Sequence, residues 1–395
     1  MVVNRRLILP IVVVAQFFGT SLWFSTNGVL ADLLSFFQLP ENALGHLTSA
    51  VQFGFICGAF FFAVFTLADR FSPSIVFVIS AVLGALLNLG VIWENNTLWS
   101  LLLLRFGTGF CLAGIYPIGI KIAADYYDEG LGKSLGYLVG ALVLGTAFPH
   151  LLVTFEQVLP WKTTIGITSA VALIGGLLLY FFVPNGPYRK PSTAFNFKAI
   201  FQVFKHRSFR QAAIGYFGHM WELYAFWAFV PALLVAYNKI HSSANIYVAP
   251  WAFVIIGVGS LSCIIAGYVS LIKGPRKTAV TLLMLSGLCC LLSPVFFLYA
   301  PPWLFLVFLL FWGMVVIADS PLFSTLVAKN AEAHIKGTAI TIVNCIGFAI
   351  TIVSIQLLQI LSKQIPYTYL LLILALGPLV GVLSISKNSS SYYKL

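Results

Sequence analysis

The chain has 395 residues, of which 60% are hydrophobic and 8% are charged, and its formal net charge is +11 at pH 7. A soluble domain of this length needs more charge to wet its surface, so a soluble enzyme or binding module is excluded. The apolar stretches are too long for the alternating strands of a membrane barrel, which predicts an all-α integral membrane protein. The basic residues lie in short loops, so the charge indicates membrane topology and no nucleic-acid partner.

Twelve membrane-spanning helices are predicted along the chain. We expect them at residues 7–31, 44–68, 75–93, 98–124, 132–156, 163–183, 210–236, 247–272, 278–299, 303–328, 337–362 and 366–386. A short basic start without a cleavage site predicts that the first span is a retained anchor. With the N-terminus in the cytoplasm, 18 of the 22 Lys and Arg residues lie in inner loops and tails, and three lie in outer loops. This predicts a multi-pass protein of the cytoplasmic (inner) membrane with both termini in the cytoplasm.

The longest inner segment covers residues 184–208 and follows the sixth span. Residues 195–204 have apolar side chains at helical spacing, which is typical either of a short amphipathic helix on the membrane surface or of a plain tether. We therefore expect a six-helix half at residues 1–183, a linker at 184–208, and a second six-helix half at 209–395.

Small residues and prolines recur at a nearly constant offset along the chain. The matching positions are Gly19 with Gly218, Gly54 with Gly257, Gly109 with Gly313, and Pro117 with Pro321. The last two pairs share the same offset. Parallel six-helix repeats of this kind are an architecture of secondary transporters.

The fourth span combines a charged residue, several small residues and a proline. Its central segment, from Arg105 to Pro117, reads RFGTGFCLAGIYP. An Arg in such an apolar run must face protein or a water-filled cavity. The small residues allow a neighbouring helix to approach closely, and Pro117 favours a kink. This combination is typical of the helices around the central cavity of a transporter.

These features resemble the major facilitator superfamily over nearly the whole chain. The closest motif match lies in the fourth span and consists of Arg105, Gly107, Gly109, Ala113, Gly114, Tyr116 and Pro117. The loop 67–70, which reads LADR, is similar to the acidic-Arg loop signature of the family, although Phe65 replaces its preceding Gly. The Gly-Pro pair typical of the family's drug/proton antiporters is absent from the fifth span. The resemblance implies two six-helix halves, a monomer, alternating access around spans 1, 4, 7 and 10, and a gating role for Asp69 and Arg70.

Three charged residues lie deep within predicted spans, namely Arg105, Glu222 and Asp319. A carboxylate in a low-dielectric midplane favours its protonated form, so Glu222 is a candidate proton carrier or substrate ligand. His219 precedes Glu222 by three residues and shares its helical face, which would allow it to relay the proton or simply to bond a neighbouring helix. Asp319 precedes Pro321 and either takes part in proton coupling or caps an irregular turn. Arg105 is expected to pair with one of these carboxylates or to bind an anionic substrate, and the resemblance implies a role in helix packing or proton coupling.

Polar and aromatic side chains within the spans supply candidates for substrate binding, although interhelical hydrogen bonds are the alternative role for each. With Arg105, the candidates are Gln16, Thr20, Trp23, Gln52, Tyr116, Trp221, Tyr224 and Asn344. Gln16, Thr20 and Trp23 share one helical face.

No nucleotide-binding or catalytic motif is present, and the six cysteines show no metal-ligand spacing, so no cofactor and no metal are expected. The leading hypothesis is a secondary active transporter that moves a small polar or amphipathic, and in one version anionic, solute together with protons into the cell. The expected partners are this small-molecule substrate, the proton and the lipid bilayer. The alternatives are a proton-antiporting exporter of drugs or metabolites and an uncoupled facilitator. An intramembrane enzyme or sensor is disfavoured because neither a catalytic cluster nor a signalling domain is visible.

Overall fold

The computed structural model describes residues 5–127, 131–155, 160–189, 202–242, 244–332 and 335–386, and every regular element within them is a helix. The first set of helices is α1 (Arg5–Thr20), α2 (Ser25–Gly28), α3 (Leu30–Phe36), α4 (Ala43–Val64), α5 (Leu67–Arg70), α6 (Pro73–Leu89), η1 (Gly90–Ile92), α7 (Leu98–Leu112), α8 (Tyr116–Tyr126), α9 (Leu131–Val153) and α10 (Trp161–Phe182). The second set is α12 (Arg207–Ile240), α13 (Val248–Gly257), α14 (Gly259–Lys273), α15 (Pro275–Tyr299), α16 (Pro302–Ala318), α17 (Ser320–Asn330), α18 (Lys336–Leu361), α19 (Tyr367–Leu370), η3 (Leu371–Ala375) and α20 (Leu376–Ser386). The predicted all-α fold is confirmed.

Within the described residues, eleven helical segments are long and apolar enough to cross a membrane. The predicted first span differs, because it is divided into α1, α2 and α3, and only Leu7–Thr20 remains as a continuous apolar helix. At the break, Thr20 Oγ1 donates to the Gln16 carbonyl at 2.8 Å and Ser21 Oγ donates to the Phe18 carbonyl at 2.7 Å. Hydroxyl groups that bond the preceding turn favour bending of a helix, which explains why this span is interrupted here.

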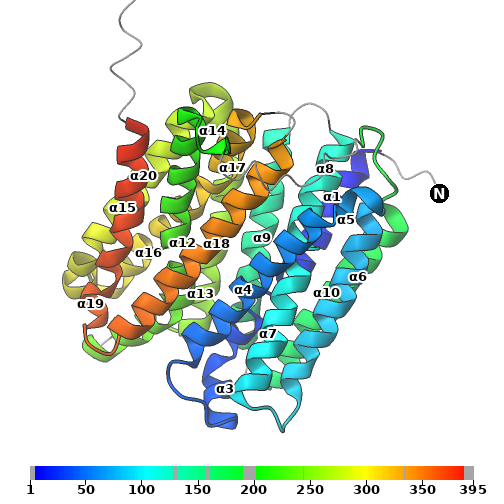
Figure 1. Cartoon of the computed structure of the whole chain (residues 1–395). Coiled ribbons are helices and arrows are strands. Elements are labelled where there is room, and N and C mark those ends of the chain that lie inside the picture. The colour runs from blue at the N-terminus through cyan, green and yellow to red at the C-terminus, as the bar shows by residue number, and fades with distance from the viewer. Residues whose placement is uncertain are drawn as a thin grey trace, which may run out of the picture.

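The helices form one bundle, with α1–α10 on one side and α12–α20 on the other (Figure 1). The beginning of α1 and the end of α20 lie at the same end of the bundle, together with α5, α8 and α17. We call this end the termini side and the opposite end, which carries α3 and α19, the far side.

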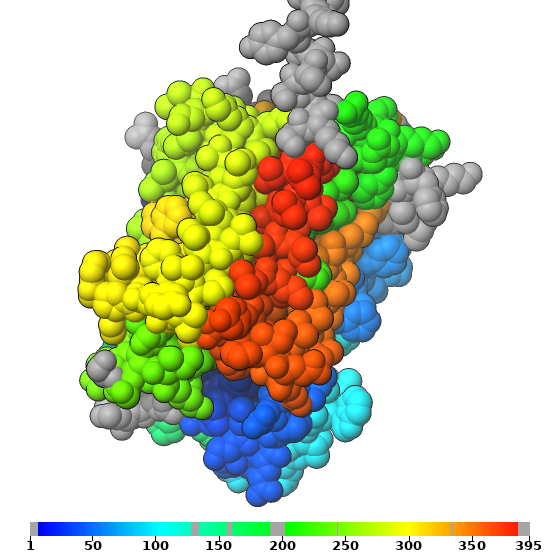
Figure 2. Space-filling model, turned by 90° about the vertical axis from the view of Figure 1, so that its left-hand side faces the viewer, coloured from blue at the N-terminus to red at the C-terminus, as the bar shows by residue number. Residues whose placement is uncertain are grey.

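The two sets of helices meet along a seam, formed by α4 against α18 and by α9 against α13 and α14. Figure 2 shows the outer face of the second set, where α20 lies beside α15, and the N-terminal helices emerge below α18. A continuous buried core contains apolar side chains from both sets. On the outside, large apolar side chains such as Leu103 (70% exposed) and Phe181 (67% exposed) are suited to contact with lipid.

The structure repeats at the offset found in the sequence. Helices α7 and α8 begin at Leu98 and Tyr116, and α16 and α17 begin at the equivalent positions of the second set, Pro302 and Ser320. In the first set, α7 approaches α4 so closely that a Cβ on Gly109 would overlap the Val51 carbonyl. In the second set, a Cβ on Gly313 would overlap the Ile255 carbonyl, and the offset from Val51 to Ile255 equals that from Gly109 to Gly313. Glycine at both positions therefore permits the same tight helix pair twice.

The predicted short helix at residues 195–204 falls largely outside the described residues. The division of the chain at residues 184–208 stays a prediction.

Candidate functional site

A cavity of 490 Å³ lies between α4, α8 and α18 on the termini side. Its described lining includes Asn344, which was predicted to bind substrate, and Asp69, which was predicted to act as a gate. The other polar and charged side chains that line it are Thr66, Lys121, Lys336, Thr338 and Thr341. Because its walls come from both sets of helices, a movement of one set against the other would open or close it.

Phe55 of α4 lines this cavity and also belongs to a cluster of aromatic rings at the seam. We call this cluster the aromatic plug; it consists of Trp23, Phe24 and Phe55 from the first set and Tyr224, Trp227 and Phe348 from the second. The Trp23 ring stacks on Phe348 with 5.7 Å between centroids, and Phe55 lies 4.3 Å from Phe348. All six rings are buried. The aromatic plug therefore adjoins the cavity through Phe55 and packs the two sets of helices against each other.

Arg105 of α7 is fully buried and bonds the interrupted first span. Its Nη2 donates to the carbonyls of Leu22 and Trp23 at 3.0 and 2.6 Å, and its Nη1 donates to Ser25 Oγ and Asn88 Oδ1 at 3.1 and 3.0 Å. These carbonyls need an external donor because the helix is broken between α1 and α2. Among the described residues, the predicted pairing of Arg105 with a carboxylate is not found, since its four acceptors are neutral. The residue instead holds the turn that carries Trp23.

Glu222 of α12 is 1% exposed and points into the second set of helices, between α15 and α16. Its Oε1 accepts from Trp312 Nε1 at 2.6 Å and from Cys290 Sγ at 3.4 Å, and its Oε2 lies 2.9 Å from Ser286 Oγ. These partners are neutral groups, so the carboxylate is buried with hydrogen-bond donors and without a cation in the described residues.

His219 contacts Asp319 rather than Glu222. His219 Nδ1 lies 2.7 Å from Asp319 Oδ1, and both side chains are at most 1% exposed. The second nitrogen of His219 and the second oxygen of Asp319 have no hydrogen-bond partner among the described residues. Asp319 occupies the junction between α16 and α17, where the new helix begins at Ser320 and carries Pro321 in its first turn. The His219 ring also lies 6.0 Å from the Tyr216 ring, and α17, which follows Asp319, packs against α9 of the first set.

The predicted gating loop contacts α8. Asp69 Oδ1 lies 2.8 Å from Lys121 Nζ, and the same ammonium lies 3.7 Å from Asp125. Arg189, which follows α10, donates to the carbonyls of Asp69 and Phe71 at 2.8 and 2.7 Å. These contacts lie within the first set of helices, at the mouth of the cavity. The neighbouring Arg70 is exposed.

The other predicted substrate residues take several positions. Gln16 and Gln52 are fully buried, and their amide groups have no hydrogen-bond partner among the described residues. Thr20 bonds its own helix, as described above. Tyr116 is half-buried and packs against the continuous buried core.

Trp221 lies away from the seam. Its Nε1 donates to the Ile373 carbonyl at 3.1 Å, and its ring packs where α12 approaches Gly377. The structure thus does not bring Trp221 to the cavity or to the aromatic plug.

Sequence reasoning did not select several residues that the structure places at these sites. Asn88, the one amide side chain of the predicted third span, bonds Arg105 and also Ser169 at 2.9 Å, and its polarity was a usable signal. Trp312, Ser286 and Cys290 surround Glu222, but no pattern along the chain links them to it. Trp227 of the aromatic plug resembles the other tryptophans of the spans until its neighbours are known.

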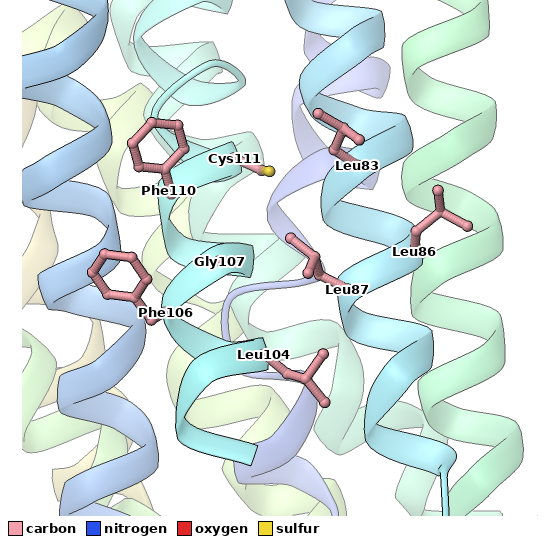
Figure 3. A pocket seen from close by; sticks show the side chains of 8 residues that line it. All are labelled: Leu83, Leu86, Leu87, Leu104, Phe106, Gly107, Phe110 and Cys111. Atoms are coloured by element: carbon pink, nitrogen blue, oxygen red, sulfur yellow. The ribbon is translucent and has the colours of Figure 1, made fainter. Parts of the chain in front are cut away.

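A second hollow of 440 Å³ lies between α6 and α7 (Figure 3). Its lining is entirely apolar and includes Leu86, which is 58% exposed, and Phe110. The hollow therefore suits contact with lipid rather than with a polar solute. No group of three His, Cys, Asp or Glu residues that could hold a metal is found in the described parts of the chain.

Comparisons with known proteins identify a family and two curated relatives. The profile of the Major Facilitator Superfamily matches residues 12–355. A probable L-galactonate transporter of Escherichia coli (strain K12) is 25% identical over 224 residues, which cover 50% of this chain and 48% of the relative. Protein spinster homolog 3 of Danio rerio is 25% identical over 181 residues, which cover 42% of this chain and 33% of the relative. The chain thus aligns with half or less of the length of these curated relatives.

A crystal structure of the nucleoside transporter NupG, in mutant form, is similar in fold. The TM-score is 0.71 at 17% identity, and the match covers 97% of this chain and 99% of the other. At this level of identity the similarity shows a shared fold.

Proposed function

Since this chain belongs to the Major Facilitator Superfamily, we propose that it takes up a small organic anion of the sugar-acid type together with protons. The chain is a multi-pass membrane protein and a transporter of a small-molecule solute, not an enzyme. The coupling, the direction and the substrate class form the proposal, and they rest on the arguments below.

The buried pair of His219 and Asp319 is the observation that carries proton coupling. The two titratable groups lie 2.7 Å apart and are shielded from water. They can take up a proton from the solvent, or release one to it, only when a conformational change exposes them to water. The pair sits at the helix junction of α16 and α17 and beside Tyr216. Uptake and release of a proton here would thus be linked to movement at the seam.

Glu222 is a second candidate proton carrier, and its surroundings accommodate both protonation states. When Glu222 is ionised, Ser286 Oγ donates to its Oε2 at 2.9 Å. When Oε2 is protonated, it can donate to Ser286 Oγ, whose own hydrogen then turns to the Leu283 carbonyl at 3.1 Å. The donors to Oε1 are unaffected, so neither state leaves a buried polar group unpaired.

An anionic substrate is supported by the charge at the mouth of the cavity. Lys121 and Lys336 line it against a single carboxylate in its described lining, Asp69, which pairs with Lys121, so the ammonium of Lys336 is the excess charge. The threonines and Asn344 supply hydrogen-bond partners for hydroxyl groups. The name of the E. coli relative, a probable transporter of L-galactonate, points to the same chemistry.

We place both termini in the cytoplasm of a cell with an inner membrane, so the cavity faces inward and the aromatic plug closes the outer path. The helix ends on the termini side carry most of the described basic residues, which supports this orientation. A monomer whose halves, residues 1–183 and 209–395, rock about the seam would expose the central region alternately to the two sides. Asp69 and Arg70 would act as the inner gate.

Transport in proteoliposomes tests the proposal. Vesicles with an imposed inward proton gradient should accumulate radiolabelled L-galactonate or D-gluconate, and a protonophore should abolish the accumulation. Asp319→Asn and Glu222→Gln should lose accumulation yet retain exchange of labelled for unlabelled substrate, which needs no net proton movement.

His219→Gln has a matched control in His150→Gln, since His150 is also buried but lies in α9 away from both carboxylates. We expect only the former to lose gradient-driven accumulation. Accumulation by the wild type that ignores the proton gradient would identify an uncoupled facilitator. Movement of hydrophobic cations out against the gradient would identify an exporter.

A further inference from the structure

Two buried tryptophans at the seam have indole N–H groups without a partner. Trp23 and Trp227 are 1% and 0% exposed, and neither Nε1 finds a hydrogen-bond acceptor among the described residues. Two other tryptophans of the spans do find one, since Trp221 donates to the Ile373 carbonyl and Trp312 donates to Glu222. A buried donor without an acceptor costs free energy, so its presence calls for an explanation.

The two unpaired donors belong to one place in the molecule. The Trp23 and Trp227 rings lie 5.7 and 5.3 Å from the ring of Tyr224, measured between centroids. Trp23 comes from the turn between α1 and α2, whereas Trp227 and Tyr224 come from α12. The donors therefore stand on opposite sides of the seam and would separate when the two sets of helices move apart.

A third unpaired group lies in α4 on the same seam. Both amide atoms of Gln52 lack partners in the described part of the chain, and the side chain is fully buried. Phe55, one turn further along α4, packs against Trp23 with 5.0 Å between centroids. The amide adds an acceptor and two further donor hydrogens to the two indole groups.

The buried Arg105 already has a different role beside these groups. Both of its terminal nitrogens are occupied, and two of their four acceptors are the carbonyls of Leu22 and Trp23. Arg105 thus acts as a positioning residue for the turn that presents the Trp23 ring. The polar groups left for a ligand at the aromatic plug are therefore neutral, and most of them are hydrogen-bond donors.

We infer that Trp23, Trp227 and Gln52 form a substrate subsite that binds the oxygen atoms of a sugar acid, with the rings of Tyr224 and Phe348 against its apolar face. An indole N–H donates and cannot accept, so the two N–H groups suit carboxylate or hydroxyl oxygens and cannot accept a hydrogen bond from an ammonium group. The inference rests on the proposed function for its substrate class. It goes further by naming the residues that select the substrate, including Trp227.

Replacement of tryptophan by phenylalanine removes the N–H group and keeps an aromatic ring. The chain supplies a matched control, because Trp221→Phe removes an N–H group that bonds the backbone away from the seam. Binding of six-carbon aldonates to the purified variants is measured by isothermal titration calorimetry, and thermal unfolding without substrate checks that each variant is folded. We expect the Kd to rise about tenfold for Trp23→Phe and for Trp227→Phe, the factor that corresponds to one hydrogen bond to a charged group. Trp221→Phe should bind like the wild type.

The outcomes separate this inference from the proposed function. Aldonate binding that is equally tight in Trp23→Phe, Trp227→Phe and the wild type would overturn the subsite and leave proton-coupled uptake standing. Absence of aldonate binding to the wild type would overturn the substrate class and the subsite together. Should one variant fail to fold, the other decides, and Gln52→Leu provides a third test with the same expected direction.

Discussion

The close approach of paired helices can be tested by adding a single methyl group. An alanine Cβ at position 109 would lie far inside the 3.4 Å at which ordinary contact with the Val51 carbonyl oxygen begins. The obstacle is backbone, which cannot rotate away as a side chain can, so α7 must shift from α4 or bend. Overpacking in a well-packed interior costs about 1–3 kcal/mol. The new Cβ is fixed to the backbone of α7, and the Val51 carbonyl is fixed in the backbone of α4, so neither can move alone. We therefore expect Gly109→Ala to lower the free energy of unfolding by about 3 kcal/mol.

The internal repeat predicts a second, equivalent substitution with the same effect. Gly313→Ala meets the Ile255 carbonyl at the same distance and should destabilise the protein by a similar amount. Gly166→Ala is the control, since Gly166 lies in the second turn of α10 and a Cβ there has no neighbour within 4 Å. It should leave stability unchanged or raise it by up to about 1 kcal/mol through helix propensity.

Thermal unfolding in detergent, followed by intrinsic fluorescence, compares the three variants. For a chain of this size, about 3 kcal/mol corresponds to a fall in Tm of roughly 4 °C. A Gly109→Ala variant with the Tm and transport rate of the wild type would refute the close packing of α4 and α7. Unequal losses for Gly109→Ala and Gly313→Ala would refute the equivalence of the two helix pairs.

Three further substitutions address the buried polar groups and the gate. Arg105→Lys keeps the charge, but its ammonium has three donor hydrogens and loses at least one of the four buried hydrogen bonds. Unfolding in detergent should therefore show a loss of about 2 kcal/mol, and wild-type stability would contradict the positioning role. Asp69→Asn removes the partner of Lys121, and because both side chains are partly exposed it should cost less than about 1 kcal/mol while slowing uptake. A cost of several kcal/mol would instead make this pair structural. Ser286→Ala removes the hydroxyl that serves both protonation states of Glu222, so uptake driven by a proton gradient should fall while exchange persists, and an unchanged ratio of the two rates would exclude Ser286 from the proton path.

Local patterns along the chain were sufficient to predict much of the architecture. Long apolar runs predict membrane helices because each run carries its own preference for lipid over water. The constant offset between Gly109–Pro117 and Gly313–Pro321 also predicts that the helix interruptions recur, and α8 and α17 do begin at equivalent positions. Charges inside these runs drew attention to Arg105 because their burial is costly wherever they point.

The partners of those charges were decided only by the tertiary structure. His219 and Glu222 are three residues apart on one helix, yet His219 contacts Asp319 of the α16–α17 junction, whereas Glu222 contacts α15 and α16. Arg105 bonds carbonyls that became available because the first span is broken, and hydropathy does not reveal that break. The indole N–H of Trp227 has no acceptor among the described residues, and this depends on which side chains the packed helices place around it. Hydrophobicity is a property of a segment and can be read locally, whereas pairing depends on which residues, distant in the chain, the packed helices bring within hydrogen-bond distance.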